Sequence, residues 1–327
     1  MELKTDYAIL KQDYECFKPY FEMHRQSIEK LFYHYLNQGN SKDLNVFLER
    51  NTDKEITNEF KQKFIYNSTV CFYRSFDLFL ALITLESRKF NTWSEVTAYY
   101  SKFYIIKAIC FLFQRGYIVM KSYDKEPLKD KNDKKFFFYF DTKLQLFNQK
   151  NTEYNELFKN GIGSHQVWWA LLNSLKGVDG IKNERFNFVL DQYLTNPSIR
   201  NEVNYSLEYL EGFHELEWFD SNIQERFNRI NYPTSNIRDF TSKERYYQNT
   251  HPEEIDEGDY YTDIRVYIWE SLLCYLEVFR DLLGDNFLLR KENIEYLLEV
   301  HRIKEINSSL EINIKSDLER IFAQTIL

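Results

Sequence analysis

Residues 98–109 read A-Y-Y-S-K-F-Y-I-I-K-A-I, and this stretch decides the fold class. One helical face carries apolar residues at steps of three and four: Tyr99, Phe103, Ile106, Cys110 and Phe113. Apolar side chains at the positions between them fill most of the other faces, and a helix that is apolar nearly all round is buried. We therefore expect a central core helix that begins near Ser94 and ends just before Gly116, with this glycine at the C′ position.

Helical spacing continues on both sides of this stretch. Before it, residues 1–60 and 57–88 carry apolar side chains mostly at steps of three and four. After it, Ser164 precedes another apolar periodic segment and serves as its expected N-cap. Further helices are expected from near Ile199 past Phe213, over about 263–284 and over about 291–325. Loops are expected at 177–180 and in the acid-rich stretch 251–263.

The segment 117–142 has a different character. Tyr117–Met120 and Phe136–Phe140 are typical of strands, and a charged stretch that contains Pro127 separates them. The pattern predicts a β-hairpin with a long loop. Residues 121–143 carry seven lysines against five acids, which fits either a small basic flap for RNA or a solvated loop of mixed charge.

Composition excludes several protein classes. The chain has 327 residues, of which 43% are hydrophobic and 28% are charged, as in ordinary globular proteins. Only 9 glycines and 5 prolines are present, too few for the many turns of an all-β sandwich or barrel. Aromatic residues make up 18%, which favours long helices packed through bulky rings. The net charge of −8 argues against generic nucleic-acid binding but permits a local basic site.

The cysteines and the N-terminus predict a soluble, cytoplasmic protein. The four cysteines form no C-x-x-C pair and lie mostly in apolar stretches, so we expect reduced thiols: Cys16, Cys71, Cys110 and Cys274. The N-terminal residues contain no apolar signal region. The apolar stretch Phe103–Phe113 is too short to cross a membrane, so no membrane contact is expected.

Three segments, taken in order, resemble one protein superfamily. Residues 98–109 resemble the buried A-Y-Y-x-x-F helix of HEPN domains (higher eukaryotes and prokaryotes nucleotide-binding). Residues 199–205, I-R-N-E-V-N-Y, are similar to the R-N-x-x-x-H motif of the last core helix in that family, and residues 163–168 resemble the start of the preceding helix. The resemblance covers about residues 61–220.

The resemblance implies an all-α fold, an up-and-down helical bundle with the small β-hairpin as an insertion. It divides the chain into an N-terminal helical segment (1–60), a HEPN-like core (61–220) and a C-terminal helical segment (221–327). Many members of the family are metal-independent ribonucleases that act as homodimers in toxin–antitoxin or phage-defence systems. The implied partners are RNA, a protein partner such as an antitoxin, and a second copy of the chain. No cofactor is expected.

The candidate catalytic residues are Arg200, Asn201, Tyr205 and His165. The resemblance implies that Arg200 binds the scissile phosphate, for which a guanidinium has the right planar donors. Residues five apart on a helix lie about 140° and about 7.5 Å apart, so Arg200 and Tyr205 can reach one groove. Tyr205 stands where the family has histidine, and a phenol with a pKa near about 10 is a poor general base at neutral pH. His165 is therefore the second candidate for moving protons.

Several alternatives stay open at this point. Arg200 can instead form a structural ion pair with a neighbouring acid. In that case the chain is a non-catalytic helical scaffold or a protein-binding module. The acidic stretch 251–263 lacks the EF-hand pattern, so a solvated linker is preferred to a cation site. Trp168 and Trp169 suit core packing better than base stacking. Motifs of P-loop ATPases, Rossmann oxidoreductases, G-x-S-x-G hydrolases and zincins do not occur in the sequence.

Overall fold

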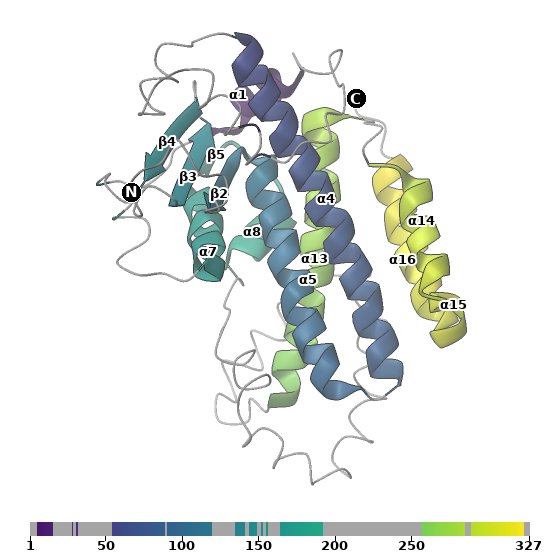
Figure 1. Ribbon diagram of the computed structural model, residues 1–327. Coiled ribbons are helices and arrows are strands. Elements are labelled where there is room, and N and C mark those ends of the chain that lie inside the picture. Colours follow the sequence, from purple (N-terminus) through teal and green to yellow (C-terminus); the bar gives the residue numbers. More distant parts are fainter. Residues whose placement is uncertain are drawn as a thin grey trace. The chain divides into compact units, whose positions relative to one another are not determined.

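The described part of the chain is mostly helical, as the sequence predicts (Figure 1). The computed structural model describes residues 5–15, 54–88, 90–119, 135–140, 144–148, 164–191, 257–284 and 289–323, with the single positions 28, 31, 152 and 155. Most of the expected helix in residues 1–60 and the whole of the expected helix from Ile199 past Phe213 lie outside these residues.

The chain forms two compact units, each made of three separate stretches. Unit 1 comprises Met1–Phe72, Ile106–Asn183 and Val278–Leu288. Unit 2 comprises Tyr73–Ile105, Glu184–Glu277 and Leu289–Leu327. Three long helices contribute residues to both units: α4 (Lys54–Ser87), α5 (Asn91–Leu112) and α13 (Glu257–Leu283).

Helix α5 is the buried central helix that the sequence predicts. Its side chains in both units are mostly inaccessible to solvent, and in unit 2 the parallel rings of Tyr99 and Phe103 lie 6.5 Å apart. Serines let α4 approach it closely. In unit 2, Ser75 and Ser101 each donate a hydrogen bond of 2.8 Å to the other's carbonyl oxygen. The helix begins at Asn91, three residues before the predicted start, and Ser94 is buried in its first turn.

Unit 1 combines helices with two small sheets. Its other described elements are β1 (Thr5–Asp6), α1 (Tyr7–Glu15), β2 (Arg115–Val119), β3 (Lys135–Phe140), β4 (Leu144–Asn148), α7 (Ser164–Ser174), the 3₁₀ helix η3 (Leu175–Gly177) and β5 (Val178–Asp179). Strands β2 and β3 pair antiparallel, with Tyr117 opposite Phe137, which confirms the predicted hairpin. Strand β4 extends this sheet in the order β2-β3-β4 and was not predicted.

The prediction of loop structure at 177–180 was wrong. Val178 and Asp179 form β5, which pairs in parallel with Thr5 and Asp6 of β1. Each strand has two residues and no alternation of polarity, so local sequence carries no signal for this pairing. The two paired strands are more than 170 residues apart in the sequence.

Gly116 does not cap α5, which corrects another expectation. The left-handed position after the helix is taken by Gln114, with φ of 55°, and Gly116 lies within β2. A Cβ atom on Gly116 would overlap the ring of Phe138 and lie 2.9 Å from Cε1 of Phe111. The glycine therefore makes room for an aromatic ring from the neighbouring strand.

In its described residues, unit 2 contains four helices besides parts of α4, α5 and α13. They are α8 (Glu184–Asp191), α14 (Lys291–Val300), α15 (Ile303–Ile306) and α16 (Ser308–Ala323). The predicted helix over 291–325 is thus three helices, because Arg302 adopts a left-handed conformation with φ of 52° and Asn307 is extended. Helix α13 begins at Glu257, inside the stretch predicted to be a polar connection.

Aromatic rings fill both cores, as the composition predicts. In unit 1, Phe64 stacks on Phe138 with ring centroids 4.7 Å apart. In unit 2, Phe79 stacks on Trp269 at 5.5 Å. The three described cysteines are free and buried, as expected: Cys71, Cys110 and Cys274.

One described helix is long and apolar enough to cross a membrane. It is the part of α4 from Glu59 to Ser87, and 56% of its most apolar window is buried inside the protein. Core helices of soluble proteins share these properties, so this helix is weak evidence for a membrane span.

Candidate functional site

The four candidate residues from the sequence are not brought together by the described part of the structure. Arg200, Asn201 and Tyr205 lie outside the described residues. His165 is the second residue of α7 in unit 1 and is half-buried. Helix α7 begins at Ser164, which confirms the predicted helix and makes this serine its first residue.

The start of α7 is anchored to α5 through Trp168. Its ring lies 5.0 Å from Phe111, and the ammonium of Lys107 lies over it at 4.8 Å from the centroid. Trp168 and Trp169 are 4% and 6% exposed. Their rings belong to the core of unit 1, which leaves no face for stacking on a nucleobase.

Unit 1 contains a fully buried cation, Arg115. Its guanidinium donates hydrogen bonds to Oγ of Ser174 at 2.6 Å and to Oγ1 of Thr5 at 3.0 Å. Burial lowers the pKa of Arg115 to about 10, against the opposing effects of Cys110 and Tyr139, so it remains a cation at neutral pH. Its bonds join β1, β2 and the end of α7, and this role is structural.

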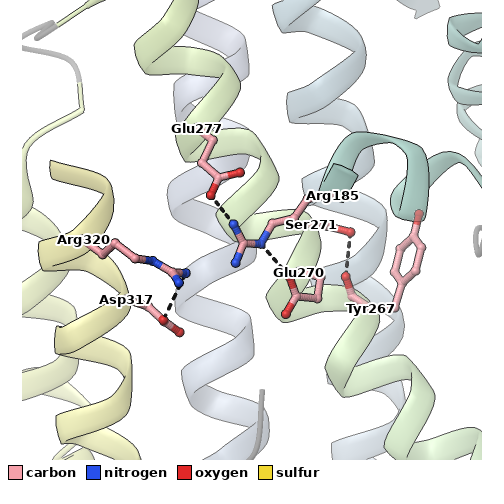
Figure 2. A network of polar contacts seen from close by, with 7 residues as sticks. All are labelled: Arg185, Tyr267, Glu270, Ser271, Glu277, Asp317 and Arg320. Atoms are coloured by element: carbon pink, nitrogen blue, oxygen red, sulfur yellow. Dashed lines mark hydrogen bonds and ion pairs between the residues drawn. The ribbon is translucent and has the colours of Figure 1, made fainter. Parts of the chain in front are cut away.

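A group of charged side chains, some of them buried, lies in unit 2 (Figure 2). We call it the acid–arginine cluster, and its members are Arg185, Glu270, Glu277, Asp317 and Arg320. Arg185 on α8 donates through Nε to Oε2 of Glu270 at 2.7 Å, and its Nη1 pairs with Glu277. Asp317 pairs with Arg320 on α16 at 3.4 Å.

Helix geometry explains why one guanidinium meets two carboxylates. Glu270 and Glu277 are seven residues apart on α13, which places them on nearly the same face and about 10.5 Å apart along the axis. Arg185 extends from the first turn of α8 between them, as Figure 2 shows. Its side chain is 15% exposed, and the Glu270 side chain is 1% exposed. The pairs are therefore largely shielded from water and from salt.

Hydrogen bonds hold α8 against α13 beside the cluster. The hydroxyl of Tyr267 donates to the carbonyl oxygen of Val189 at 3.1 Å. One turn later, Oγ of Ser271 donates to the carbonyl oxygen of Tyr267 at 2.6 Å. The ammonium of Lys102 lies 4.2 Å from the centre of the Tyr267 ring. The bond from Tyr267 to Val189 joins α13 to α8, the helix that carries Arg185, whereas the bond from Ser271 lies within α13 and the contact of Lys102 joins α5 to α13.

Burial gives two carboxyls of the cluster unusual pKa values. Burial raises the pKa of Glu270 to about 7, although Arg185 opposes this shift through its charge and its hydrogen bond. Burial raises the pKa of Asp317 to about 6, while Arg320 and Arg185 act in the opposite direction. Burial also lowers the pKa of Arg185, but Glu270 and Glu277 outweigh this effect, so the net pKa is raised.

Two oxygens of these carboxyls have no hydrogen-bond partner in the described structure. They are Oε1 of Glu270 and Oδ2 of Asp317, and both are buried. Nε1 of Trp269 also has no partner of good geometry, although its proximity lowers the pKa of Asp317. Buried polar atoms without partners are uncommon and are typical of functional or strained positions.

The cluster consists of carboxyl and guanidinium groups, and burial raises the pKa of two of its carboxyls, Glu270 and Asp317, toward neutrality. Within the described ranges, no group of three or more histidine, cysteine or acidic side chains is arranged to hold a metal ion. A second buried pair, Arg265 with Glu86, joins α13 to α4 in unit 2 through two contacts and leaves neither of these carboxylate oxygens unbound.

Sequence reasoning did not identify the acid–arginine cluster. One signal was available: Glu270 interrupts an otherwise apolar run, I-W-E-S-L-L-C-Y-L, from Ile268 to Leu276. A charged residue in such a run needs a buried partner. The partner Arg185 is 85 residues away, so local spacing does not reveal it.

Comparison with known proteins found no match: no family model, no curated protein and no solved structure is similar to this chain.

Proposed function

We propose that this chain is a HEPN-like component of a bacterial phage-defence or toxin system. In this proposal the chain folds around a HEPN-like helical core and cleaves RNA as a homodimer without a metal ion. The observation that carries the proposal is the order of three segments in the sequence: residues 98–109, residues 163–168 and the R-N-x-x-x-Y motif of residues 200–205. The burial of Tyr99 and Phe103 within α5 supports it, because the corresponding helix of the family is a core helix.

The proposed reaction is attack of a ribose 2′-hydroxyl on the adjacent phosphate. The 2′-oxygen forms a bond to phosphorus, the bond from phosphorus to the 5′-oxygen breaks, and a 2′,3′-cyclic phosphate results. One proton leaves the 2′-hydroxyl and one is delivered to the departing 5′-oxygen. Arg200 binds the charged phosphate through its planar donors, and Asn201 orients Arg200.

Proton transfer is assigned to Tyr205 or His165. Tyr205 is a hydrogen-bond donor and a weak acid at neutral pH, so it suits protonation of the leaving oxygen better than activation of the 2′-hydroxyl. His165 is the second candidate, because imidazole is the side-chain group best suited in general to move protons at neutral pH. It is half-buried at the beginning of α7, where its accessibility is compatible with this role.

A cleavage assay tests the proposal. Purified protein is incubated with total RNA and with tRNA in EDTA, beside Arg200→Ala and the control Arg88→Ala, an exposed arginine of unit 2. Cleavage by the native chain and by Arg88→Ala, with at least a hundredfold loss in Arg200→Ala, supports the proposal. Equal activity in all three proteins, or activity that EDTA abolishes, contradicts it.

A second candidate function is a non-catalytic helical module that binds a protein partner. The phenol of Tyr205 in place of an imidazole favours it, because the motif then lacks its usual base. It predicts no cleavage of RNA by a protein that is folded and dimeric by light scattering. It also predicts that Arg200→Ala lowers the free energy of unfolding, since Arg200 then stabilises the fold.

A further inference from the structure

The acid–arginine cluster contains more negative than positive charge when every group is ionised. Glu270, Glu277 and Asp317 contribute three negative charges, and Arg185 and Arg320 contribute two positive charges. Among these five side chains the excess is therefore one negative charge, and Glu270 and Asp317 are the most buried of the three carboxylates, with side chains that are 1% and 5% exposed. An uncompensated buried charge is costly, and a carboxyl group removes it by taking up one proton.

The two oxygens without partners show where this proton belongs. Oε1 of Glu270 and Oδ2 of Asp317 are buried and accept no hydrogen bond within the described structure. An ionised carboxylate is only an acceptor, whereas a protonated one also donates through its O–H. Protonation of either group thus removes charge and adds a donor that is able to bond to a neighbouring oxygen.

We propose that unit 2 contains a buried proton-binding site, shared by Glu270 and Asp317 around the Arg185 guanidinium, and that release of its proton loosens α16. This inference does not depend on the proposed reaction with RNA. It assigns the cluster a regulatory role, as a contact that weakens when the pH rises.

Helix α16 is the element whose packing we expect to weaken most when this proton is released. Its other described buried side chains are apolar: Leu310, Ile314, Leu318 and Ile321. Asp317 is 4% exposed on the same buried surface. The groups outside α16 that influence Asp317 belong to α8 and α13: Arg185, Trp269 and Glu277. A new negative charge at Asp317 or Glu270 therefore acts on the attachment of α16 to these two helices.

Among the residues that the structure describes, the charged and titratable groups that act on Glu270 and Asp317 belong to three helices. Arg185 comes from α8, Glu277 and Cys274 come from α13, and Arg320 comes from α16. Burial raises the pKa of Cys274 well above its usual range, so this thiol stays neutral. The two carboxyls, with pKa values of about 7 and about 6, interact and titrate as a pair near neutral pH.

Hydrogen exchange of α16 measures the predicted loosening. Peptides covering residues 308–323 are followed by mass spectrometry at pH 6 and pH 8, after correction for the intrinsic rise of exchange with pH. We expect the pKa of Glu270 to fall from about 7 to about 4.5 when α16 detaches. The equilibrium constant for this detachment is then about tenfold larger at pH 8 than at pH 6. The same peptides in Glu270→Gln should change less than about threefold, because Asp317 alone still titrates.

A control variant, a substitute variant and a spectroscopic measurement complete the test. Glu319→Gln, on the exposed side of α16, should retain the tenfold change of the native chain. If Glu270→Gln does not fold, Asp317→Asn takes its place. Infrared spectra of the native chain should show a protonated carboxyl at pH 6 that disappears by pH 8. Equal opening of α16 at both pH values, an unchanged response in the glutamine variant, or a missing carboxyl band would overturn the proposal.

Discussion

At the scale of the residue, Arg185 determines how the charges of unit 2 are arranged. It is the cation that pairs with both Glu270 and Glu277, and it also acts on Asp317 from a different helix. Buried ion pairs give little net stability relative to apolar residues, but removal of one partner leaves an uncompensated charge. The consequences of changing Arg185 therefore depend on pH.

Arg185→Met should destabilise the chain by about 3–5 kcal/mol at pH 8. The loss should be smaller at pH 5. Without the guanidinium, the raised pKa of Glu270 rises further, so the folded variant binds a proton that the unfolded chain releases above about pH 4.5. Its stability consequently falls as the pH increases. Denaturant unfolding of the native chain and the variant at pH 5 and pH 8 measures this difference.

The matched control for Arg185 is Arg302→Met, because the Arg302 side chain is 74% exposed. This variant should change stability by less than about 1 kcal/mol at either pH. A loss in Arg185→Met that is the same at both pH values would contradict the assigned electrostatics.

Gly116 makes a second prediction at this scale. Gly116→Ala places a methyl group against the rings of Phe138 and Phe111, which are buried and stacked. Overpacking of this kind typically costs about 1–3 kcal/mol. Val119→Ala on the same strand is the control, since Val119 is 40% exposed and should lose less. Equal unfolding free energies for the two variants would refute the packing role of Gly116.

At the scale of the element, the break between α14 and α15 shows what periodicity misses. Apolar residues continue at helical spacing from Ile294 through Ile303 to Leu310, so a single helix was predicted. The interruption occurs at Arg302, which adopts a conformation that glycine or asparagine usually takes. Neither glycine nor proline marks the site, and both α14 and α15 contact α16.

Arg302→Gly should stabilise the chain by up to about 1 kcal/mol, because glycine adopts the left-handed conformation without strain. Lys304→Gly, two residues later in α15, should instead destabilise it by about 1 kcal/mol, because glycine is unfavourable within a helix. Thermal and denaturant unfolding of both variants checks the opposite signs. Destabilisation by both glycines would mean that the backbone at Arg302 is not strained.

Elements with a strong periodic signal were predicted well, and short ones were not. The buried helix around Tyr99 and the hairpin of β2 and β3 follow directly from apolar spacing and from runs of aromatic residues. Strands β1 and β5 have only two residues each, and they pair although they are far apart in the sequence. Local propensity contains no information of that kind.

At the scale of the whole molecule, α4, α5 and α13 contribute to both compact units. The sequence predicted long aromatic-rich helices but not this division, because each unit combines three distant stretches of chain. The same limit applies to the acid–arginine cluster: Glu270 was visible as a charge in an apolar run, whereas its partners Arg185 and Asp317 were not. The predicted site at Arg200 lies outside the described residues and stays a prediction.

We propose that the whole molecule cleaves RNA through a ribose 2′-hydroxyl, and a substrate that lacks this hydroxyl is the sharpest test of that reaction. The protein is incubated in EDTA with a single-stranded RNA and with the same sequence made entirely of 2′-deoxynucleotides. We expect that only the RNA is cut, that its 5′ fragment ends in a 2′,3′-cyclic phosphate, and that Arg200→Ala forms none of this product. Cleavage of both strands, or no cleavage by protein shown to be folded and dimeric, would contradict it.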